Sequence, residues 1–316
     1  MPLSVTVAIC TWNRAAALDR VLTEFTTVTI PAGCTWEVVV VNNNCTDRTD
    51  EVIAKHTTSL PLKRLFEPTP GISHARNRAV TETTSDIILW IDDDALPDAE
   101  WIAAHLDAFN LWQADLVIGK VEPLWETGHA PKWYGPEFHG MFALLDYGST
   151  TRVITDPTET GYNVNLGFRR DFATSIGAYR LDIGTGRRAG GEDQDLCQRA
   201  HTAGKVVVYQ PMALVRHIIP ASRCTKDFYR RYMWSGSTNH LKLLQDEATK
   251  VPRLLGLPRY FVRMNLGYLC KLIGNALTLN SSKAFYYELK LIRFVGLYWC
   301  MIVKKDPLSY DKRIGE

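Results

Sequence analysis

Two clusters of acidic side chains are the residues of this sequence best suited to chemistry. The first is three consecutive carboxylates, Asp92, Asp93 and Asp94, which follow an apolar run at residues 87–91. Adjacent carboxylates repel one another strongly unless a cation lies among them. The triplet therefore predicts a metal site, with an acidic turn that caps the next helix as the alternative.

The second acidic cluster is Glu192 and Asp193, which follow Gly190 and Gly191 where a helix is expected to begin. A helix start lowers the pKa of a carboxylate, so that it stays ionised and can accept a proton as a general base. A simple helix cap is the alternative role. His217 follows a short apolar run and either completes a metal site or lies in the core.

Polar side chains also follow the other apolar runs of the N-terminal half. The groups after residues 5–10 and 37–41 offer hydrogen bonds to a base and a ribose, although Asn and Thr also suit ordinary turns. In the segment 71–78 an arginine is placed to meet a phosphate or carboxylate with two hydrogen bonds, unless it is a surface residue. These candidates are Thr11, Asn13, Arg14, Asn42, Asn43 and Arg76.

A sheet has to bring these groups together. The apolar runs at residues 5–10, 37–41, 62–66 and 87–91 alternate with stretches of helical spacing, which predicts a parallel, right-handed, doubly wound sheet. Ligands bind at the carboxyl ends of such strands, where the polar groups stand. Further strands are expected at residues 116–121, at 163–169 as an edge strand, and at 206–209.

Charge is distributed unevenly along the 316 residues. Residues 1–219 carry 19 Lys and Arg against 27 Asp and Glu, a net −8, and residues 220–316 carry 17 against 7, a net +10. We therefore expect a catalytic domain over 1–220 and a basic, aromatic-rich helical extension over 221–316. The extension is expected to contain helices at 228–244, 258–279 and 283–303. We expect these helices to attach to a membrane surface, with packing on the sheet as the alternative.

The compartment is expected to be the cytoplasm, with peripheral attachment to the inner face of the cell membrane. The seven cysteines form no Cys-x-x-Cys pair, which favours a reducing compartment over a disulfide framework or zinc site. The chain begins without a basic, cleavable leader and contains no run of 18 apolar residues. The basic charges of the extension are interleaved with apolar residues, so we expect no nucleic-acid partner.

The joint pattern resembles the family 2 glycosyltransferases, which have the GT-A fold. The motifs that carry the resemblance occur in the family's order over residues 5 to about 217, and the remaining tail is not covered. They lie at residues 7–14, 38–47, 71–78, 89–94, 191–193 and 215–217. The resemblance implies an α/β fold with a GT-A type, doubly wound, mostly parallel sheet and a C-terminal helical extension.

The resemblance also implies transfer of a sugar from a nucleotide diphosphate sugar, expected to be a UDP-sugar. Asn42 departs from the family pattern, which has an aspartate facing the uracil, because an amide both donates and accepts hydrogen bonds. The implied nucleotide-sugar-binding residues are Thr11, Asn13, Arg14, Asn42, Asn43, Arg76, Asp92 and Asp93.

On the catalytic side the resemblance implies Asp94 as a direct ligand of Mg²⁺ or Mn²⁺, with His217 as an added ligand that suits Mn²⁺. Asp193 would remove the proton from an acceptor hydroxyl, and the transfer would invert the anomeric centre. The acceptor, a glycan or lipid-linked molecule in cell-surface polysaccharide synthesis, would be shaped by four residues. They are Glu192, Gly191, Trp125 and Trp133.

Three other functions compete with this interpretation. An aspartate-nucleophile phosphatase would carry its acidic pair after the first strand, whereas three predicted strands precede this one. A sugar nucleotidylyltransferase would need a Gly-rich, Arg-containing loop after the first strand, where residues 11–14 read Thr-Trp-Asn-Arg. A non-catalytic sugar-nucleotide-binding subunit is disfavoured by the presence of both Asp94 and Asp193.

Overall fold

The computed structural model describes residues 3–183, 191–235, 237, 252–254 and 257–303, and the chain divides into two compact units. Unit 1 comprises Met1–Leu124 and Phe142–Ile218, and unit 2 comprises Trp125–Met141 and Ile219–Glu316. The early segment 125–141 is thus grouped with the C-terminal part of the chain. Gly190 lies outside the described residues, as do residues 236 and 238–244 of the helix expected over 228–244.

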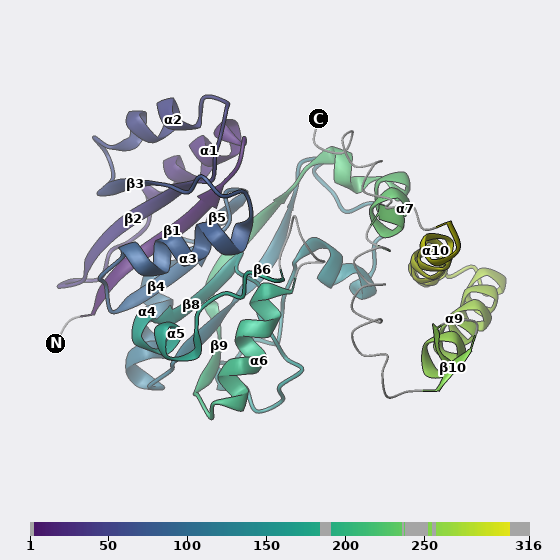
Figure 1. The fold of residues 1–316 in the computed structure, drawn as a ribbon. Helices are drawn as coiled ribbons and strands as arrows, with labels where there is room; N and C mark the ends of the chain where they lie inside the picture. Colours follow the sequence, from purple (N-terminus) through teal and green to yellow (C-terminus); the bar gives the residue numbers. More distant parts are fainter. Residues whose placement is uncertain (1–2, 184–190, 236, 238–251, 255–256, 304–316) are drawn as a thin grey trace. The chain divides into compact units, whose positions relative to one another are not determined.

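Unit 1 is built on a sheet of nine strands among the described residues, in the order β3-β2-β1-β4-β8-β6-β9-β5, with β7 paired to β9. Figure 1 shows β3, β2, β1 and β4 side by side, and the pairings among these four are parallel. The strands are β1 (Ser4–Thr11), β2 (Thr35–Asn42), β3 (Leu62–Phe66), β4 (Ile87–Ile91), β5 (Ala95–Pro97), β6 (Leu116–Trp125), β7 (Arg152–Val153), β8 (Asn165–Arg169) and β9 (Val207–Ile219).

Helices connect the parallel strands, as the alternating pattern predicts. In the first of them the buried side chains are Leu18, Val21, Leu22 and Phe25, a spacing that gives one apolar face at 3.6 residues per turn. The α/β fold class expected from the sequence is confirmed. The helices of unit 1 are α1 (Ala15–Phe25), α2 (Thr49–His56), α3 (Ile72–Glu82), α4 (Trp101–Leu111), α5 (Arg170–Ile176) and α6 (Glu192–Thr202).

The strand register gathers the polar groups at one edge of the sheet. β1 pairs with β4 so that Val5 lies opposite Ile87, and with β2 so that Thr11 lies opposite Asn42. All five residues of β4 are buried, which fits a strand covered on both faces. The residues directly after β1, β2 and β4 therefore leave the sheet together.

The strand expected at the sheet edge lies in the interior instead. β8 pairs antiparallel with both β4 and β6, so the edge position predicted for residues 163–169 is wrong. The buried Asn165 holds this arrangement, because its amide nitrogen donates to the carbonyl oxygens of Lys120 and Ala213, each at 2.7 Å, while its oxygen accepts from the Trp101 indole at 2.9 Å. A Cβ atom on Gly119 would meet Asn165 and the Ala213 carbonyl oxygen.

Unit 2 contains helices and a short antiparallel hairpin. Its centre is aromatic: the ring of Trp133 lies 5.0 Å from those of Phe138 and Phe285 and 5.5 Å from that of Tyr229, between centroids. Its elements are η1 (Pro136–Phe142), η2 (Ala221–Cys224), α7 (Lys226–Ser235), β10 (Arg253–Leu254), β11 (Leu257–Pro258), α9 (Arg259–Leu277) and α10 (Ser281–Val303).

α9 has one packed side and one exposed side. Phe261 packs on Phe294 and Tyr268 on Tyr287, which joins α9 to α10. The exposed side carries large apolar side chains of 43–79% exposure, which are Leu266, Leu269, Ile273 and Leu277. Within the described residues, neither α9 nor any other helix combines the length and apolar character needed to cross a bilayer.

Candidate active site

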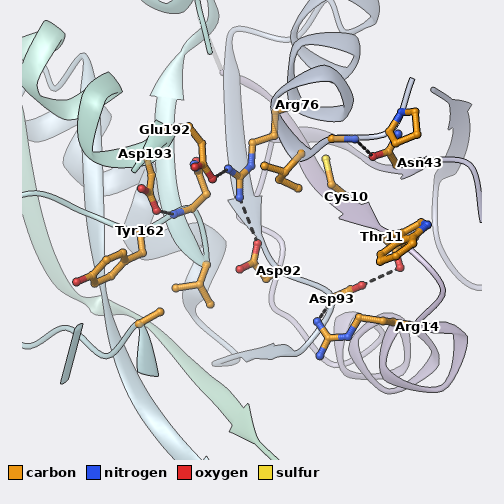
Figure 2. A pocket seen from close by; sticks show the side chains of 17 residues that line it. Cys10, Thr11, Arg14, Asn43, Arg76, Asp92, Asp93, Tyr162, Glu192 and Asp193 are labelled. Atoms are coloured by element: carbon orange, nitrogen blue, oxygen red, sulfur yellow. Dashed lines mark hydrogen bonds and ion pairs between the residues drawn. The ribbon is translucent and has the colours of Figure 1, made fainter. Parts of the chain in front are cut away.

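A pocket of about 760 Å³ lies in unit 1, at the carboxyl ends of β1, β2 and β4 and the start of α6. Figure 2 shows Glu192 and Asp193 on one side of Arg76, and Asp92 and Asp93 on the other. The volume lies in the range of sites for small organic ligands. The predicted residues that line it are Thr11, Arg14, Asn43, Arg76, Asp92, Asp93, Glu192 and Asp193.

Arg14 supplies positive charge to the carboxylate triplet. Its two terminal nitrogens lie 2.6 Å from Asp93 Oδ1 and 2.7 Å from Asp94 Oδ2. The Thr11 hydroxyl donates to Asp93 Oδ2 at 2.7 Å. Burial raises the pKa of Asp93 to about 7 although Arg14 opposes the shift. Burial alone would also raise the pKa of Asp94, but His217 and Arg14 outweigh it and hold that pKa below its ordinary value.

His217 is brought to Asp94 by the pairing of β5 with β9, in which Ala95 lies opposite His217. Its Nδ1 lies 2.7 Å from the Phe142 carbonyl oxygen and therefore carries a proton. Its Nε2 faces Asp94 Oδ2 at 3.4 Å. Burial tends to lower the pKa of His217, but Asp94 raises it above the ordinary value.

This arrangement fits a divalent cation. A protonated imidazole donates from Nε2 to Asp94, whereas a neutral imidazole with its proton on Nδ1 turns the Nε2 lone pair toward the same carboxylate, so that both groups could bind one cation. Metal-binding histidines commonly donate their second nitrogen to a backbone carbonyl, as His217 does to Phe142. The described residues contain no group of three potential ligands, so Asp94 and His217 would supply only part of a coordination shell.

Arg76 links the two acidic clusters. It is 5% exposed, and its guanidinium lies 2.6 Å from Glu192 Oε1 and 3.7 Å from Asp92 Oδ1. It also lies 5.5 Å from the ring centroid of Tyr179. A buried guanidinium with these partners keeps its charge, and it connects α3 with the end of β4 and the start of α6.

Asp193 lies in the pocket wall. Its Oδ1 accepts a hydrogen bond from the backbone N–H of Gln194 at 2.8 Å, and its Oδ2 accepts one from the backbone N–H of Asn163 at 3.4 Å. Desolvation and the neighbouring Glu192 charge raise the pKa of Asp193 to about 6, against the opposing effect of Arg76. The expectation that the helix start lowers this pKa is wrong, because removal of water outweighs the helix dipole. Such a carboxylate is ionised at neutral pH and a stronger base than usual.

Three predicted asparagines shape the loops around the pocket. Asn13, which has a positive φ of 52°, accepts from the Thr46 amide at 2.7 Å. Asn42 donates to Asp50 and accepts from the Cys45 amide, each at 2.7 Å, so its amide is already paired. Asn43 donates to two backbone carbonyls and accepts from the Gly71 amide at 3.0 Å.

The remaining predicted residues flank or lie apart from these groups. Gly191 precedes α6 with φ of 112°, a conformation that glycine adopts without strain. Trp125 and Trp133 belong to unit 2, where Trp125 lies 5.1 Å from Tyr134 between ring centroids. The acceptor roles expected for the two tryptophans stay predictions.

Two residues of this pocket region were not expected from the sequence. Asn163 lines the pocket and is 1% exposed, and the hydroxyl of the buried Tyr179 lies 2.6 Å from its Oδ1. A polar pair of this kind leaves no periodic signal in a sequence. The only sign was the position of Asn163 at the start of the strand expected over residues 163–169.

Comparison with known proteins identifies the family. The model of glycosyl transferase family 2 matches residues 6–174, which is more than half of the 316 residues. The succinoglycan biosynthesis protein ExoM of Rhizobium meliloti is 25% identical over 250 residues, covering 78% of this chain and 77% of that protein. The glucosyl-dolichyl phosphate glucuronosyltransferase of Haloferax volcanii is 28% identical over 187 residues, 57% of this chain and 58% of its own length.

Solved structures share the fold. A mannosyltransferase from Pyrobaculum calidifontis in complex with GDP-Man and Mn²⁺ aligns with a TM-score of 0.56 at 16% identity, covering 100% of this chain and 80% of that one. TarS of S. aureus, residues 1–349 with UDP-GlcNAc, aligns at 0.53 and 12% identity, with 90% of each chain covered. The GT-A type of fold expected from the sequence is thereby confirmed.

Proposed function

The chain belongs to glycosyl transferase family 2, and we propose that it transfers a sugar from a nucleotide diphosphate sugar to a hydroxyl of a glycan or lipid-linked acceptor, with inversion. A UDP-sugar is the proposed donor, and cell-surface polysaccharide synthesis the proposed setting. The similarity to a succinoglycan biosynthesis protein supports that setting. One observation carries the proposal: Asp193 and two members of the triplet, Asp92 and Asp93, line one pocket, and Arg76 lies between Asp92 and Glu192, the neighbour of Asp193.

The nucleotide end of the donor is proposed to lie beside Thr11, Arg14 and the loop after β2. Arg14 and Arg76 would face the diphosphate, because guanidinium groups bind phosphate oxygens with paired hydrogen bonds. Asn13 and Asn42 are proposed to act through the loops that they hold, since their side-chain groups bond within the protein.

A divalent cation, Mn²⁺ or Mg²⁺, is proposed to be held by Asp94 and His217, with Asp92 and Asp93 close by. When bound, such a cation stabilises the negative charge that develops on a departing diphosphate. The position of His217 supports this assignment, because its Nε2 lies 3.4 Å from Asp94 Oδ2 while its Nδ1 is bonded to the Phe142 carbonyl oxygen. The Mn²⁺ bound in the mannosyltransferase that shares the fold supports it further.

Asp193 is the proposed catalytic base. Its carboxylate takes the proton of the acceptor hydroxyl, whose oxygen bonds to the anomeric carbon while the bond from that carbon to the diphosphate breaks. Attack from the face opposite the leaving group inverts the centre. Glu192 and Gly191 flank the base, and Trp125 and Trp133 are proposed to contact the acceptor.

Turnover of a sugar nucleotide tests this proposal. Purified protein with Mn²⁺ is expected to release UDP from UDP-glucose or another UDP-sugar, and Asp193→Asn should lower the rate about 100-fold or more. Asp195→Asn is the matched control, because Asp195 lies on the same helix and pairs with Arg199 at 2.7 Å. Sugar-nucleotide binding without any turnover would instead favour the non-catalytic subunit.

Peripheral contact with an anionic membrane surface is proposed for α9. Its exposed apolar side chains accompany Arg259, Arg263 and Lys271, and the helix has no acidic residue. Apolar burial combined with attraction to anionic lipid is the usual basis of such contact. The inner face of the cell membrane is the proposed surface.

Vesicle binding tests the membrane proposal. Leu277→Glu should lower binding to vesicles containing phosphatidylglycerol about tenfold, because it removes apolar burial and adds repulsion. Leu111→Glu is the control, since Leu111 on α4 is 77% exposed and Leu277 is 79% exposed. Equal binding by the two variants would contradict the proposal.

A further inference from the structure

Two buried polar atoms of residues that line the pocket have no hydrogen-bond partner among the described residues. They are the amide nitrogen of Asn163 and Oε2 of Glu192. Asn163 is 1% exposed and Glu192 is 6% exposed, and both residues line the pocket. Because a buried polar atom without a partner costs stability, such atoms at a binding site indicate groups that a ligand satisfies.

The orientation of the Asn163 amide is set by Tyr179. Burial raises the pKa of Tyr179 well above its ordinary value, so the phenol keeps its proton and donates it to Asn163 Oδ1 at 2.6 Å. Tyr179 is itself held by Asn77, whose side chain accepts from the Tyr179 amide at 2.9 Å and donates to its carbonyl at 2.7 Å. The Asn163 nitrogen is therefore the end of the amide that remains available.

Glu192 is oriented in a comparable way. Arg76 binds its Oε1 at 2.6 Å, which leaves Oε2 as the unpaired oxygen. The wall of the pocket thus contains one fixed donor and one fixed acceptor beside the proposed base, since the Asn163 backbone amide also contacts Asp193 Oδ2 at 3.4 Å. A hydroxyl group both accepts and donates hydrogen bonds, so a sugar ring with several hydroxyls matches this pair.

We propose that Asn163 Nδ2 and Glu192 Oε2 bind hydroxyl groups of the sugar ring that is transferred. In the proposed reaction this ring must lie between the diphosphate, near Arg14 and Arg76, and the base Asp193. Asn163 and Glu192 are the buried polar residues on the Asp193 side of that space. Asn163 donates to one hydroxyl oxygen and Glu192 accepts from a hydroxyl, so the pair contributes to the choice of sugar.

The inference rests on the proposed glycosyl transfer, and binding measurements separate the two. Isothermal titration calorimetry with Mn²⁺ would compare UDP with UDP-glucose, UDP-N-acetylglucosamine and GDP-mannose on the wild-type protein. The sugar nucleotide that binds most tightly then serves as the probe. If none of these nucleotides binds the folded wild-type protein, the proposed function fails and this inference fails with it.

Asn163→Ala and Tyr179→Phe form a matched pair, because both lose the hydrogen bond between the two side chains and only the first loses Nδ2. Asn163→Ala should weaken binding of the sugar nucleotide about tenfold and that of the nucleoside diphosphate less than twofold. Tyr179→Phe should weaken sugar-nucleotide binding about threefold at most. Melting curves should fall by a similar amount in both variants.

Two results would overturn the inference while leaving the transferase proposal intact. One is equal sugar-nucleotide affinity in Asn163→Ala and Tyr179→Phe. The other is an equal loss for the sugar nucleotide and for the nucleoside diphosphate in Asn163→Ala. If Asn163→Ala does not fold, Asn163→Ser replaces it under the same criteria, because serine is small and lacks the amide nitrogen.

Discussion

The buried ion pair of Arg76 makes a quantitative prediction about stability. Arg76→Met would leave Glu192, and beside it Asp92, without their countercharge in a site where Arg76 is 5% exposed. Removing one partner of a buried pair costs about 3–5 kcal/mol. For a unit of about 200 residues, each kcal/mol lowers the melting temperature by about 2–4 °C. Differential scanning calorimetry should therefore show a decrease of about 6–20 °C.

Arg78→Met provides the matched control for this measurement. Arg78 lies on the same helix and pairs with Glu82 at 3.1 Å, but both side chains are about 40% exposed. An exposed pair with this spacing contributes about 0.3–0.5 kcal/mol, so the melting temperature should fall by less than about 2 °C. Adding Glu192→Gln to Arg76→Met should recover part of the loss, because it removes the unpaired charge. The reasoning is refuted if Arg76→Met melts like Arg78→Met, or if the double variant recovers nothing.

Three further predictions concern pH, packing and the cation. Asp193 must be ionised to act as the base, and its pKa is raised to about 6. The value of kcat/KM should therefore fall about tenfold for each pH unit below pH 6. A kcat/KM that stays constant down to pH 5 would contradict the role of Asp193 as the base. Gly119→Ala should lower stability by about 1–3 kcal/mol through overpacking, whereas Gly267→Ala, with open space around it, should raise it by up to about 1 kcal/mol. Chemical denaturation distinguishes these signs, and equal effects would refute the packing argument. Removal of divalent cations with a chelator should abolish UDP release, and addition of Mn²⁺ should restore it. In Asp94→Asn, added Mn²⁺ should not restore UDP release. Activity that survives chelation would contradict the proposed role of a cation.

The sequence predicted which residues gather at the site better than how they interact. The alternating apolar runs identified the parallel strands, and the carboxyl ends of such strands meet at one edge. The partner of each charge depends on the register of the strands. Val5 lies opposite Ile87, and six residues further along each segment of the chain, just past the end of β4, Thr11 bonds to Asp93. No local pattern encodes that register, so the pairing of Arg14 with Asp93 and Asp94 could not be predicted.

Other features were beyond prediction because they depend on burial in three dimensions. A five-residue strand that contains Asn165 and Gly167 has the composition of an edge, yet it is interior because Asn165 finds partners on three sides. The pKa of Asp193 depends on how much water its neighbours exclude, which the helix start alone does not show. The availability of one end of the Asn163 amide depends on Tyr179, sixteen residues away.

The interior position of β8 also has a consequence for synthesis of the chain. β4 is apolar along its whole length. One of its two neighbours in the sheet, β8, can pair with it only after residues Asn165–Arg169 have emerged from the ribosome, since Ile87 pairs with Arg169. At translation rates of about 5–20 residues per second, the side of β4 that faces β8 stays unpaired for about 4–16 s. An open, apolar strand edge readily captures strands of other chains. The nascent protein should therefore depend on chaperones during this interval, and slower translation between β4 and β8 should increase aggregation.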